Sequence, residues 1–253
     1  MPGGVIYPIL FRRLLASVGF AWATRTIAFI MLCTSILPLI CLRKRIASTK
    51  TRTILNINAL TDASYIFFTL GSFFEFIGVY VVLFYVQLFA IQKTDVDSNL
   101  SFYLLPMINA GSCLGRLVPN FYADKFGCLN MQIPFAFISA LLAFCWMSIR
   151  DTAGIVIFCL LYGFFAGALV SLPGPTMVSL SPDLSVLGTR MGVSMTVVAL
   201  GVLIGNPVAG AFLRHDNGWI GVQSWCGGSQ AVAGILMLMA RIAKTGPYIK
   251  KKI

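Results

Sequence analysis

Seven apolar stretches, each of about 20 residues, constrain the fold of this chain more than any other feature. One aqueous core cannot absorb so many continuous apolar segments, but each is long enough to cross a bilayer as a helix. The sequence therefore predicts an all-α, polytopic integral membrane protein with about seven transmembrane helices. The predicted spans are Ala21 to Leu42, Ser64 to Ile91, Leu100 to Asn120, Met131 to Ile149, Ala153 to Leu172, Met191 to Leu213 and Gly227 to Ile242.

The composition excludes an ordinary water-soluble enzyme. Apolar residues make up 58% of the chain and charged residues 11%, with a mean hydropathy of +0.88, whereas roughly a quarter of a soluble domain is charged. The 19 Lys and Arg residues against 8 acidic residues give a net charge of +11. In a membrane chain such an excess is typical of loops held against an anionic membrane face. The expected partner is therefore the lipid bilayer and not nucleic acid.

The distribution of basic residues predicts the orientation, because positively charged loops stay in the cytoplasm. Thirteen Lys and Arg residues fall on one side of the predicted spans and six on the other. We therefore expect a cytoplasmic C-terminus, with the plasma membrane as the location. The segment Met1 to Leu10, apolar but too short to cross, is expected outside. The six basic residues of the outer side are Arg12, Arg13, Arg25, Lys93, Arg150 and Arg214.

Residue types that support catalysis are nearly absent. The single histidine, His215, lies in a predicted outer loop, which excludes a His-based metal site or a Ser-His-Asp triad inside the membrane. The seven cysteines form no C-x-x-C pair, and no phosphate-binding glycine loop is found. We expect no enzyme activity, no metal site and no cofactor.

The carboxyl of Glu75 is the first candidate for function, because ionisable groups inside a membrane are costly. It lies near the middle of its predicted span, among apolar neighbours such as Phe74 and Phe76. A carboxyl in these surroundings can carry a proton. The alternative is that Glu75 stays protonated or forms a hydrogen bond with a neighbouring helix.

A polar stripe on the next span is the second candidate. Asn109, Ser112 and Arg116 follow one another at about one helical turn, so they share one face of an otherwise apolar helix. Arg116 is predicted one turn inside the cytoplasmic end of the span. There it could snorkel to the interface or bind a substrate carboxylate through its planar fork. Residues of the preceding span that could line the same cavity are Tyr80, Tyr85 and Gln87.

Glycine and proline residues indicate close packing and broken helices. G-x-x-x-G spacings, which let helices approach closely, occur in the fifth and sixth spans at Gly163/Gly167 and Gly201/Gly205. The segment Pro173-Gly174-Pro175 is expected to end the fifth span, and Asn206-Pro207 to interrupt the sixth. Broken helices beside isolated charges are typical of transporters.

Several of these residues carry a family resemblance that covers nearly the whole chain. Gly115 and Arg116, followed by Asn120 to Gly127 (Asn-Phe-Tyr-Ala-Asp-Lys-Phe-Gly), resemble the cytoplasmic loop motif G-x-x-x-D-[RK]-x-G-[RK]-[RK] of the major facilitator superfamily in its second-half copy. Three further segments look like the fungal monocarboxylate-transporter-like branch of that family. They are Leu180 to Asp183, Gly188 to Gly192, and Gly19 to Trp22 leading to Arg25.

The resemblance implies a fold of two six-helix halves that work by alternating access around a midplane site. Residues 1–59 would then form the end of the N-terminal half: an outer loop, the sixth helix and the basic cytoplasmic central loop. Residues 60–253 would form the C-terminal six-helix half. The first five helices would be absent, so transport would need a partner half or a homodimer.

The resemblance also implies roles for single residues. Asp124, Lys125 and Gly127 match the loop motif and would gate the cytoplasmic side. Arg116 matches the arginine taken to bind the substrate carboxylate in monocarboxylate carriers, with Asn109, Ser112 and Glu75 nearby. The position of the proton-carrying aspartate in those carriers is Ser112 here, so Glu75 is the nearest substitute for proton coupling.

The function expected from these residues is secondary active transport of small organic anions such as monocarboxylates, or efflux of a related metabolite, with protons as a coupled ion. The alternative is a transport-inactive remnant or an accessory membrane subunit. A seven-helix receptor is disfavoured, because no acid-Arg-Tyr triplet follows the third span and the last span has no lysine for a retinal Schiff base.

Overall fold

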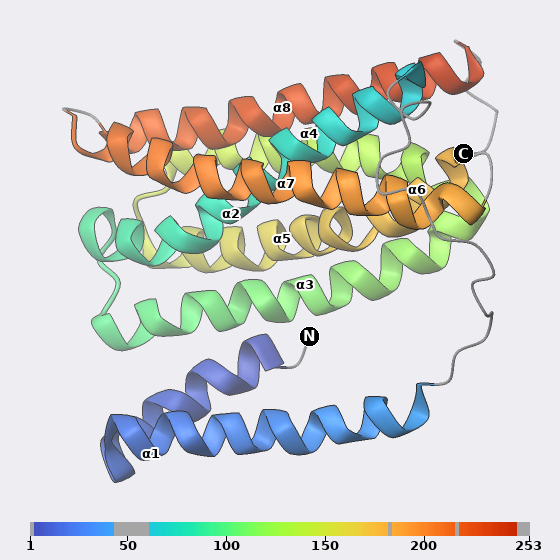
Figure 1. Ribbon diagram of the computed structural model, residues 1–253. Coiled ribbons are helices and arrows are strands. Elements are labelled where there is room, and N and C mark those ends of the chain that lie inside the picture. The colour runs from blue at the N-terminus through green and yellow to red at the C-terminus, as the bar shows by residue number, and fades with distance from the viewer. Residues whose placement is uncertain (1–2, 43–60, 182–183, 216–217, 247–253) are drawn as a thin grey trace. The chain divides into compact units, whose positions relative to one another are not determined.

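The computed structural model describes residues 3–42, 61–181, 184–215 and 218–246, all of whose regular elements are helices (Figure 1). Contacts within the chain divide it into two compact units, Met1–Thr53 and Ile54–Ile253. The predicted boundary between residues 59 and 60 lies outside the described residues and stays a prediction. Each unit is described by itself.

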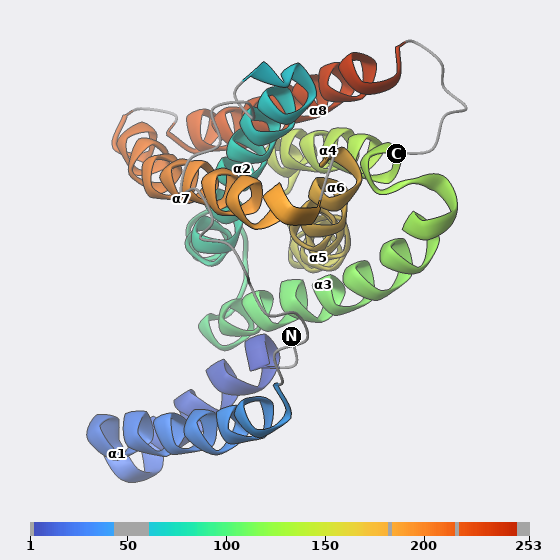
Figure 2. The same cartoon turned by 45° about the vertical axis from the view of Figure 1, so that its right-hand side comes forward.

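The first unit consists of α1, Gly3–Cys41, which is broken at Gly19. Gly19 has φ 76° and ψ 172°, a combination open to glycine and strained for other residues, and the helix turns sharply at this end (Figures 1 and 2). The segment after Gly19 matches the predicted first span. The segment before Gly19, predicted as an apolar stretch followed by an outer loop, is helical from Gly3, because Arg12 and Arg13 lower its hydropathy while remaining good helix formers; its place outside the membrane stays a prediction.

The second unit is a bundle of long helices that lie side by side (Figures 1 and 2). Helix α2 packs mainly against α8 and α7, α3 packs against α5, and α4 contacts both α8 and α5. The elements are α2 Ala63–Lys93, α3 Ser98–Phe126, α4 Cys128–Cys145, the 3₁₀ turn η2 Trp146–Ser148, α5 Thr152–Ser171, α6 Pro173–Leu180, α7 Leu184–Leu213 and α8 Gly218–Thr245.

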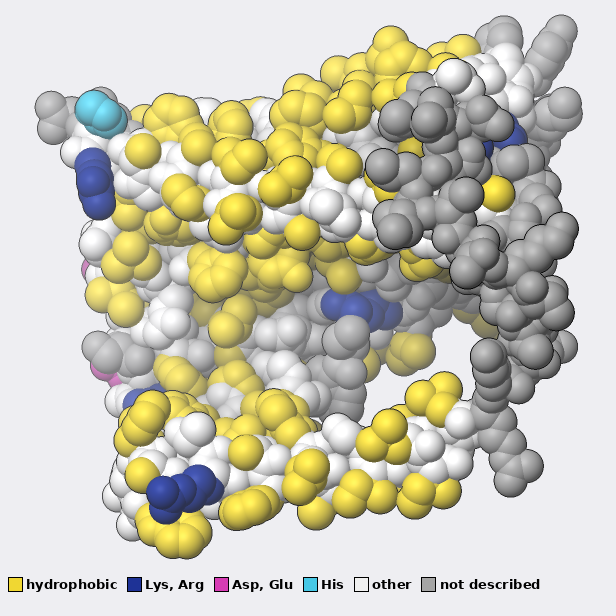
Figure 3. Space-filling model, in the orientation of Figure 1, with side chains coloured by type: hydrophobic (Ala, Val, Ile, Leu, Met, Phe, Trp, Pro, Cys, Tyr) yellow, Lys and Arg dark blue, Asp and Glu magenta, His cyan; other side chains and the backbone are white. Residues whose placement is uncertain are grey.

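Membrane-crossing helices account for most of the described chain, which confirms the predicted all-α membrane fold. Six described segments are long and apolar enough to cross a bilayer, one of them joining α5 and α6. Helix α3, with 29 residues, is long enough but is not among them, because residues such as Asn109 and Arg116 make it more polar. Hydrophobic side chains, yellow in Figure 3, are distributed along the length of the described helices.

Glycines bring α3 and α5 into backbone contact. A Cβ added to Gly115 of α3 would lie 1.8 Å from the carbonyl oxygen of Phe164, and one added to Gly167 of α5 would lie 2.4 Å from that of Ser112. Gly111 and Gly163 are equally tight. The predicted G-x-x-x-G contact at Gly163 and Gly167 therefore meets a second such pair on α3. Gly163 of α5 meets Ile108 of α3, and Gly167 meets Ser112. Because the residue numbers of the contacts increase together along both helices, α3 and α5 run parallel.

The predicted breaks in the fifth and sixth spans have different outcomes. Helix α5 ends at Ser171 and α6 begins at Pro173, which confirms the first break. The predicted interruption at Asn206-Pro207 was wrong, because α7 continues through Pro207. The Tyr85 hydroxyl donates a hydrogen bond to the Asn206 carbonyl at 3.1 Å, as expected where a neighbouring helix satisfies backbone groups around a membrane proline.

The last two helices begin earlier than hydropathy predicts. Helix α7 begins at Leu184 and not at Met191, and α8 begins at Gly218 and not at Gly227. The first turns of α8 contain polar residues whose side chains face the bundle, such as Gln223, which is 1% exposed. Such residues lower the mean hydropathy of the segment, so the predicted span begins after them, although tertiary contacts bury their side chains.

Candidate functional site

Arg116 lies in the middle part of α3, close to the Gly115 contact with α5. Ser112 is the central residue of this 29-residue helix, and Arg116 is four residues, about 6 Å, further along the axis. The Arg116 Nε donates a hydrogen bond to the Ser112 Oγ at 3.3 Å. The side chain therefore turns back toward the helix centre, whereas snorkelling would extend it toward the C-terminal end of α3. The prediction of Arg116 one turn from the helix end was wrong, because α3 continues to Phe126.

The two terminal nitrogens of the Arg116 guanidinium have no hydrogen-bond partner among the described residues, and no carboxylate pairs with them. The side chain is only partly buried. Tyr80 of α2 lies near enough to Arg116 for an electrostatic interaction, and the cavity that both residues are predicted to line stays a prediction. A partly buried guanidinium with free donors is able to bind an oxyanion.

Aromatic rings of α2 continue the surface beside Arg116. Tyr80 stacks on Phe76 with ring centroids 6.0 Å apart and on Phe84 at 6.4 Å. These residues are spaced by four and therefore lie on one face of the helix. Phe84 is 65% exposed. This face of α2 presents flat apolar groups next to a cation, which suits an aromatic or apolar anion.

Asn109 lies on the same polar stripe, but its side-chain amide nitrogen is bonded to the backbone of its own helix. Its Nδ2 donates to the Leu105 carbonyl at 3.0 Å, which leaves the side-chain oxygen available. One turn beyond Arg116, the Nδ2 of Asn120 donates to the Arg116 carbonyl at 2.7 Å and to the Ser171 hydroxyl at 3.1 Å. Asn120 thus ties the stripe to the end of α5.

Glu75 belongs to a separate polar network inside the bundle. It is 0% exposed, and its Oε2 accepts a hydrogen bond from Gln132 Nε2 of α4 at 3.0 Å. The Gln132 Oε1 in turn accepts one from the Thr176 hydroxyl of α6 at 3.2 Å. No hydrogen bond or ion pair joins Glu75 to Arg116. The structure therefore divides the predicted substrate-binding residues between two places.

The network is incomplete around Glu75, whose Oε1 is buried without a hydrogen-bond partner. Sequence reasoning missed Gln132 and Thr176. The available signal for Gln132 was a polar residue within the apolar span Met131 to Ile149, whereas Thr176 lies between two predicted spans and gave no such signal. Thr176 reaches the network because the break at Pro173 begins a new short helix.

Replacing Gln132 by leucine is expected to lower the free energy of unfolding by about 2 kcal/mol, because it leaves the buried Glu75 carboxyl without its hydrogen-bond donor, whereas the Thr176 hydroxyl keeps its bond to the Leu172 carbonyl at 2.9 Å. Chemical unfolding in detergent micelles measures the loss. Ser139→Ala on the same helix is the matched control, since the Ser139 hydroxyl is already buried without a partner. Equal stability of the two variants would show that the network contributes nothing.

The predicted gating residues lie at the corner between α3 and α4. Gly127 has φ 94° and ends one helix as it begins the next, so a residue with a Cβ would be strained there. Asp124 and Lys125 are exposed, and Lys125 lies 5.9 Å from the ring centroid of Phe126. No hydrogen bond or ion pair of Asp124 occurs within the described part of the chain, and its gating role stays a prediction.

A buried ion pair was not predicted from the sequence, because Arg190 falls just before the predicted span Met191 to Leu213. Arg190 lies in α7, and its Nη1 is 2.9 Å from Asp62 Oδ2, with side chains 5% and 26% exposed. The guanidinium lies over the Tyr65 ring at 5.1 Å, and the Tyr65 hydroxyl donates to the Arg190 carbonyl at 3.0 Å. Asp62 also caps the start of α2. The signal available was an aspartate directly before an apolar run.

The described residues contain no cluster of three or more His, Cys, Asp or Glu side chains that could hold a metal ion. All seven cysteines are free thiols. The Cys226 thiol donates to the Gly78 carbonyl at 3.1 Å in the contact between α8 and α2. The chemistry available at the Arg116 site is therefore anion binding beside an aromatic surface.

Comparison with known proteins gives consistent relatives, although no family model matches the chain. It is 38% identical over 240 residues to the MFS-type transporter dbaD of Emericella nidulans, covering 94% of this chain and 54% of the relative. It is 36% identical over 255 residues to MFS-type transporter 1 of an Ophiocordyceps species, covering 99% and 56%. The aspyridones efflux protein apdF of Emericella nidulans is 33% identical over 241 residues, covering 95% and 49%. The chain spans about half the length of these curated relatives.

Proposed function

Since the chain belongs to the major facilitator superfamily of transporters, we propose that it supplies one half of a secondary active carrier that exports small organic anions. Arg116 is the proposed contact for the carboxylate of the substrate. The observation that carries the proposal is the pair of Arg116 terminal nitrogens in the middle part of α3, on a partly exposed side chain and without a hydrogen-bond partner among the residues that the structure describes.

The proposed substrate is an acid with an apolar or aromatic body. A carboxylate would take both Arg116 terminal nitrogens in a bidentate contact, and the Tyr80 and Phe84 rings would receive the apolar part. Ser112 holds the guanidinium through Nε, and Asn109 adds a side-chain oxygen on the same face. The relative apdF is an aspyridones efflux protein, which supports export over uptake for this chain.

Proton coupling is proposed at Glu75. The carboxyl is buried, has one free oxygen and is paired with no Lys or Arg, so nothing in the network replaces the proton when it leaves. Opening of the bundle near α6 would give Glu75 access to water. Asp124, Lys125 and Gly127 are the proposed cytoplasmic gate, with the C-terminus in the cytoplasm and the protein in the plasma membrane.

Replacing Arg116 by glutamine is expected to raise the KM for anion flux by roughly 100-fold, because the charge-assisted bidentate contact is lost. The assay is saturable flux of benzoate in proteoliposomes that contain the chain and its complementary half. Arg116→Lys keeps the charge but not the fork, and is expected to retain intermediate activity. Unchanged benzoate flux in Arg116→Gln, with the protein still folded, would exclude Arg116 as the anion contact.

The second candidate function is an accessory or transport-inactive membrane subunit. It predicts no saturable flux from this chain under any pairing. Immunoblotting of native membranes separates the two cases, because a product near 27.5 kDa without a co-purifying half favours the accessory function.

A further inference from the structure

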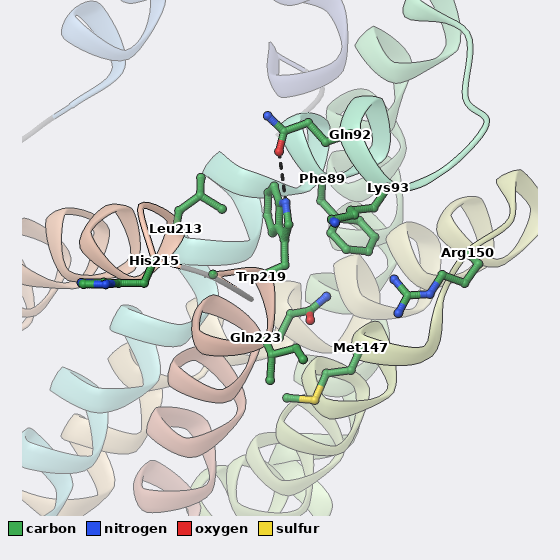
Figure 4. A pocket seen from close by; sticks show the side chains of 11 residues that line it. Phe89, Gln92, Lys93, Met147, Arg150, Leu213, His215, Trp219 and Gln223 are labelled. Atoms are coloured by element: carbon green, nitrogen blue, oxygen red, sulfur yellow. Dashed lines mark hydrogen bonds between the residues drawn. The ribbon is translucent and has the colours of Figure 1, made fainter.

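A pocket that Arg116 does not line lies at the end of the bundle where α2 ends and α8 begins (Figure 4). Its volume is about 580 Å³, within the usual range of small-molecule sites. Lys93 is the last residue of α2, Arg150 lies between η2 and α5, and Trp219 and Gln223 belong to the first turns of α8. The pocket therefore lies at helix ends, where a membrane protein meets lipid headgroups and water.

The floor of the pocket is aromatic and held in place. Phe89 and Trp219 pack edge to face with ring centroids 5.1 Å apart, and they are 1% and 8% exposed. The Trp219 Nε1 donates to Gln92 Oε1 at 3.0 Å, the contact dashed in Figure 4. Gln223 is anchored through Nε2, which donates to the Trp146 carbonyl at 3.2 Å. A floor fixed by these bonds is pre-formed for a ligand.

Two cations, Lys93 and Arg150, line the pocket, and no ion pair neutralises either of them among the described residues. In Figure 4 the Lys93 ammonium and the Arg150 guanidinium lie to the right of Trp219 and point toward the space beside it, whereas the His215 ring points away from that space. Neither Lys93 nor Arg150 forms an ion pair or hydrogen bond within the described part of the chain. The neighbouring carboxylates of Asp97 and Asp151 instead cap the first turns of α3 and α5.

We propose that this pocket binds an oxyanion group, a phosphate or carboxylate, between Lys93 and Arg150, with the attached apolar part of the ligand on Trp219. Two cations from different segments can share one oxyanion through charge-assisted hydrogen bonds. Basic pockets between membrane helices on the cytoplasmic side recognise lipid headgroups by the same chemistry, and here that chemistry is proposed for a pocket whose cations, Lys93 and Arg150, are predicted on the outer side. The oxyanion can come from an anionic phospholipid or from a free anion in the water phase.

Both sources are tested with the full chain in nanodiscs. The first probe is inorganic phosphate, added to phosphatidylcholine nanodiscs at constant ionic strength, with the shift in thermal unfolding as the readout. The second is phosphatidic acid mixed into the nanodiscs, with the retained lipid counted by native mass spectrometry. The test variant is Lys93→Gln/Arg150→Gln. The control is Arg214→Gln, which removes an exposed cation that does not line the pocket.

The double variant is expected to weaken whichever oxyanion binds by roughly tenfold or more, while Arg214→Gln changes the affinity less than about twofold. Retention of phosphatidic acid that is lost in the double variant identifies a headgroup site. Stabilisation by phosphate that is lost in the double variant identifies a site for a free anion. The proposal is overturned when neither probe binds, or when the double variant and the control lose equal affinity.

Both exposed side chains lack partners, so the double variant is expected to fold with an unchanged melting temperature in the absence of ligand. This expectation separates loss of the site from loss of structure. The result is also independent of the Arg116 proposal, because Arg116→Gln leaves the pocket intact.

Discussion

Gly115→Ala is expected to lower the free energy of unfolding by about 3 kcal/mol, as severe overpacking does in a protein core. The added methyl group would lie 1.8 Å from the Phe164 carbonyl oxygen and 2.6 Å from its carbon. These are backbone atoms that cannot rotate away, so α3 and α5 must separate. Separation would also move Arg116, the next residue, and loosen the Asn120 contact with Ser171.

The matched control is Gly228→Ala in α8, where an added Cβ meets nothing within 4 Å. Alanine favours a helix over glycine by about 1 kcal/mol, so the control is expected to be as stable as the native chain or more so. Unfolding in mixed detergent micelles compares the two. If Gly115→Ala proved as stable as Gly228→Ala, the backbone contact between α3 and α5 would not exist.

Asp62→Asn is expected to destabilise the second unit by about 3 kcal/mol, because it leaves the Arg190 charge buried without a partner. Arg190 is 5% exposed on its side chain and its Nε already lacks a hydrogen bond. Asparagine retains the ability to cap a helix, so the loss reports on the ion pair and not on the start of α2. Unfolding by denaturant at neutral pH in detergent provides the measurement.

The double variant Asp62→Asn/Arg190→Leu tests the cause of that loss. Removing the orphaned charge together with its partner is expected to recover roughly half of the stability, because an apolar side chain of similar volume avoids the desolvation cost. The Tyr65 hydroxyl still reaches the backbone carbonyl of residue 190, since that bond does not involve the side chain. A double variant less stable than Asp62→Asn would contradict an ion-pair origin.

Helix number and the polar stripe were largely predictable, because both depend on local sequence. Spans such as Ser64 to Ile91 appear as apolar runs of membrane length, and Ser112 and Arg116 share a face by helical periodicity alone. Helix ends were less predictable. The early start of α8 depends on Gln223 and Gln230, whose polar side chains are buried by neighbouring helices.

The partners of the buried polar residues were not predictable. Glu75 and Gln132 are 57 positions apart, and Asp62 and Arg190 are 128 apart. Whether such residues meet depends on the rotation and depth of each helix, which hydropathy does not describe. In this bundle, close contacts at residues such as Gly115 set those positions.

The sequence by itself determined that the chain is solvated by lipid and crosses it as helices, because in a bilayer every backbone polar group must be satisfied within the helix and every long apolar run favours the membrane. Only the tertiary structure decided that Glu75 lies in the core of the bundle, apart from Arg116. It also decided that Arg190 is buried against Asp62 and that Lys93 and Arg150 line one pocket. These outcomes depend on how helices pack against one another, and in lipid that packing follows from shape and hydrogen bonding more than from hydrophobicity.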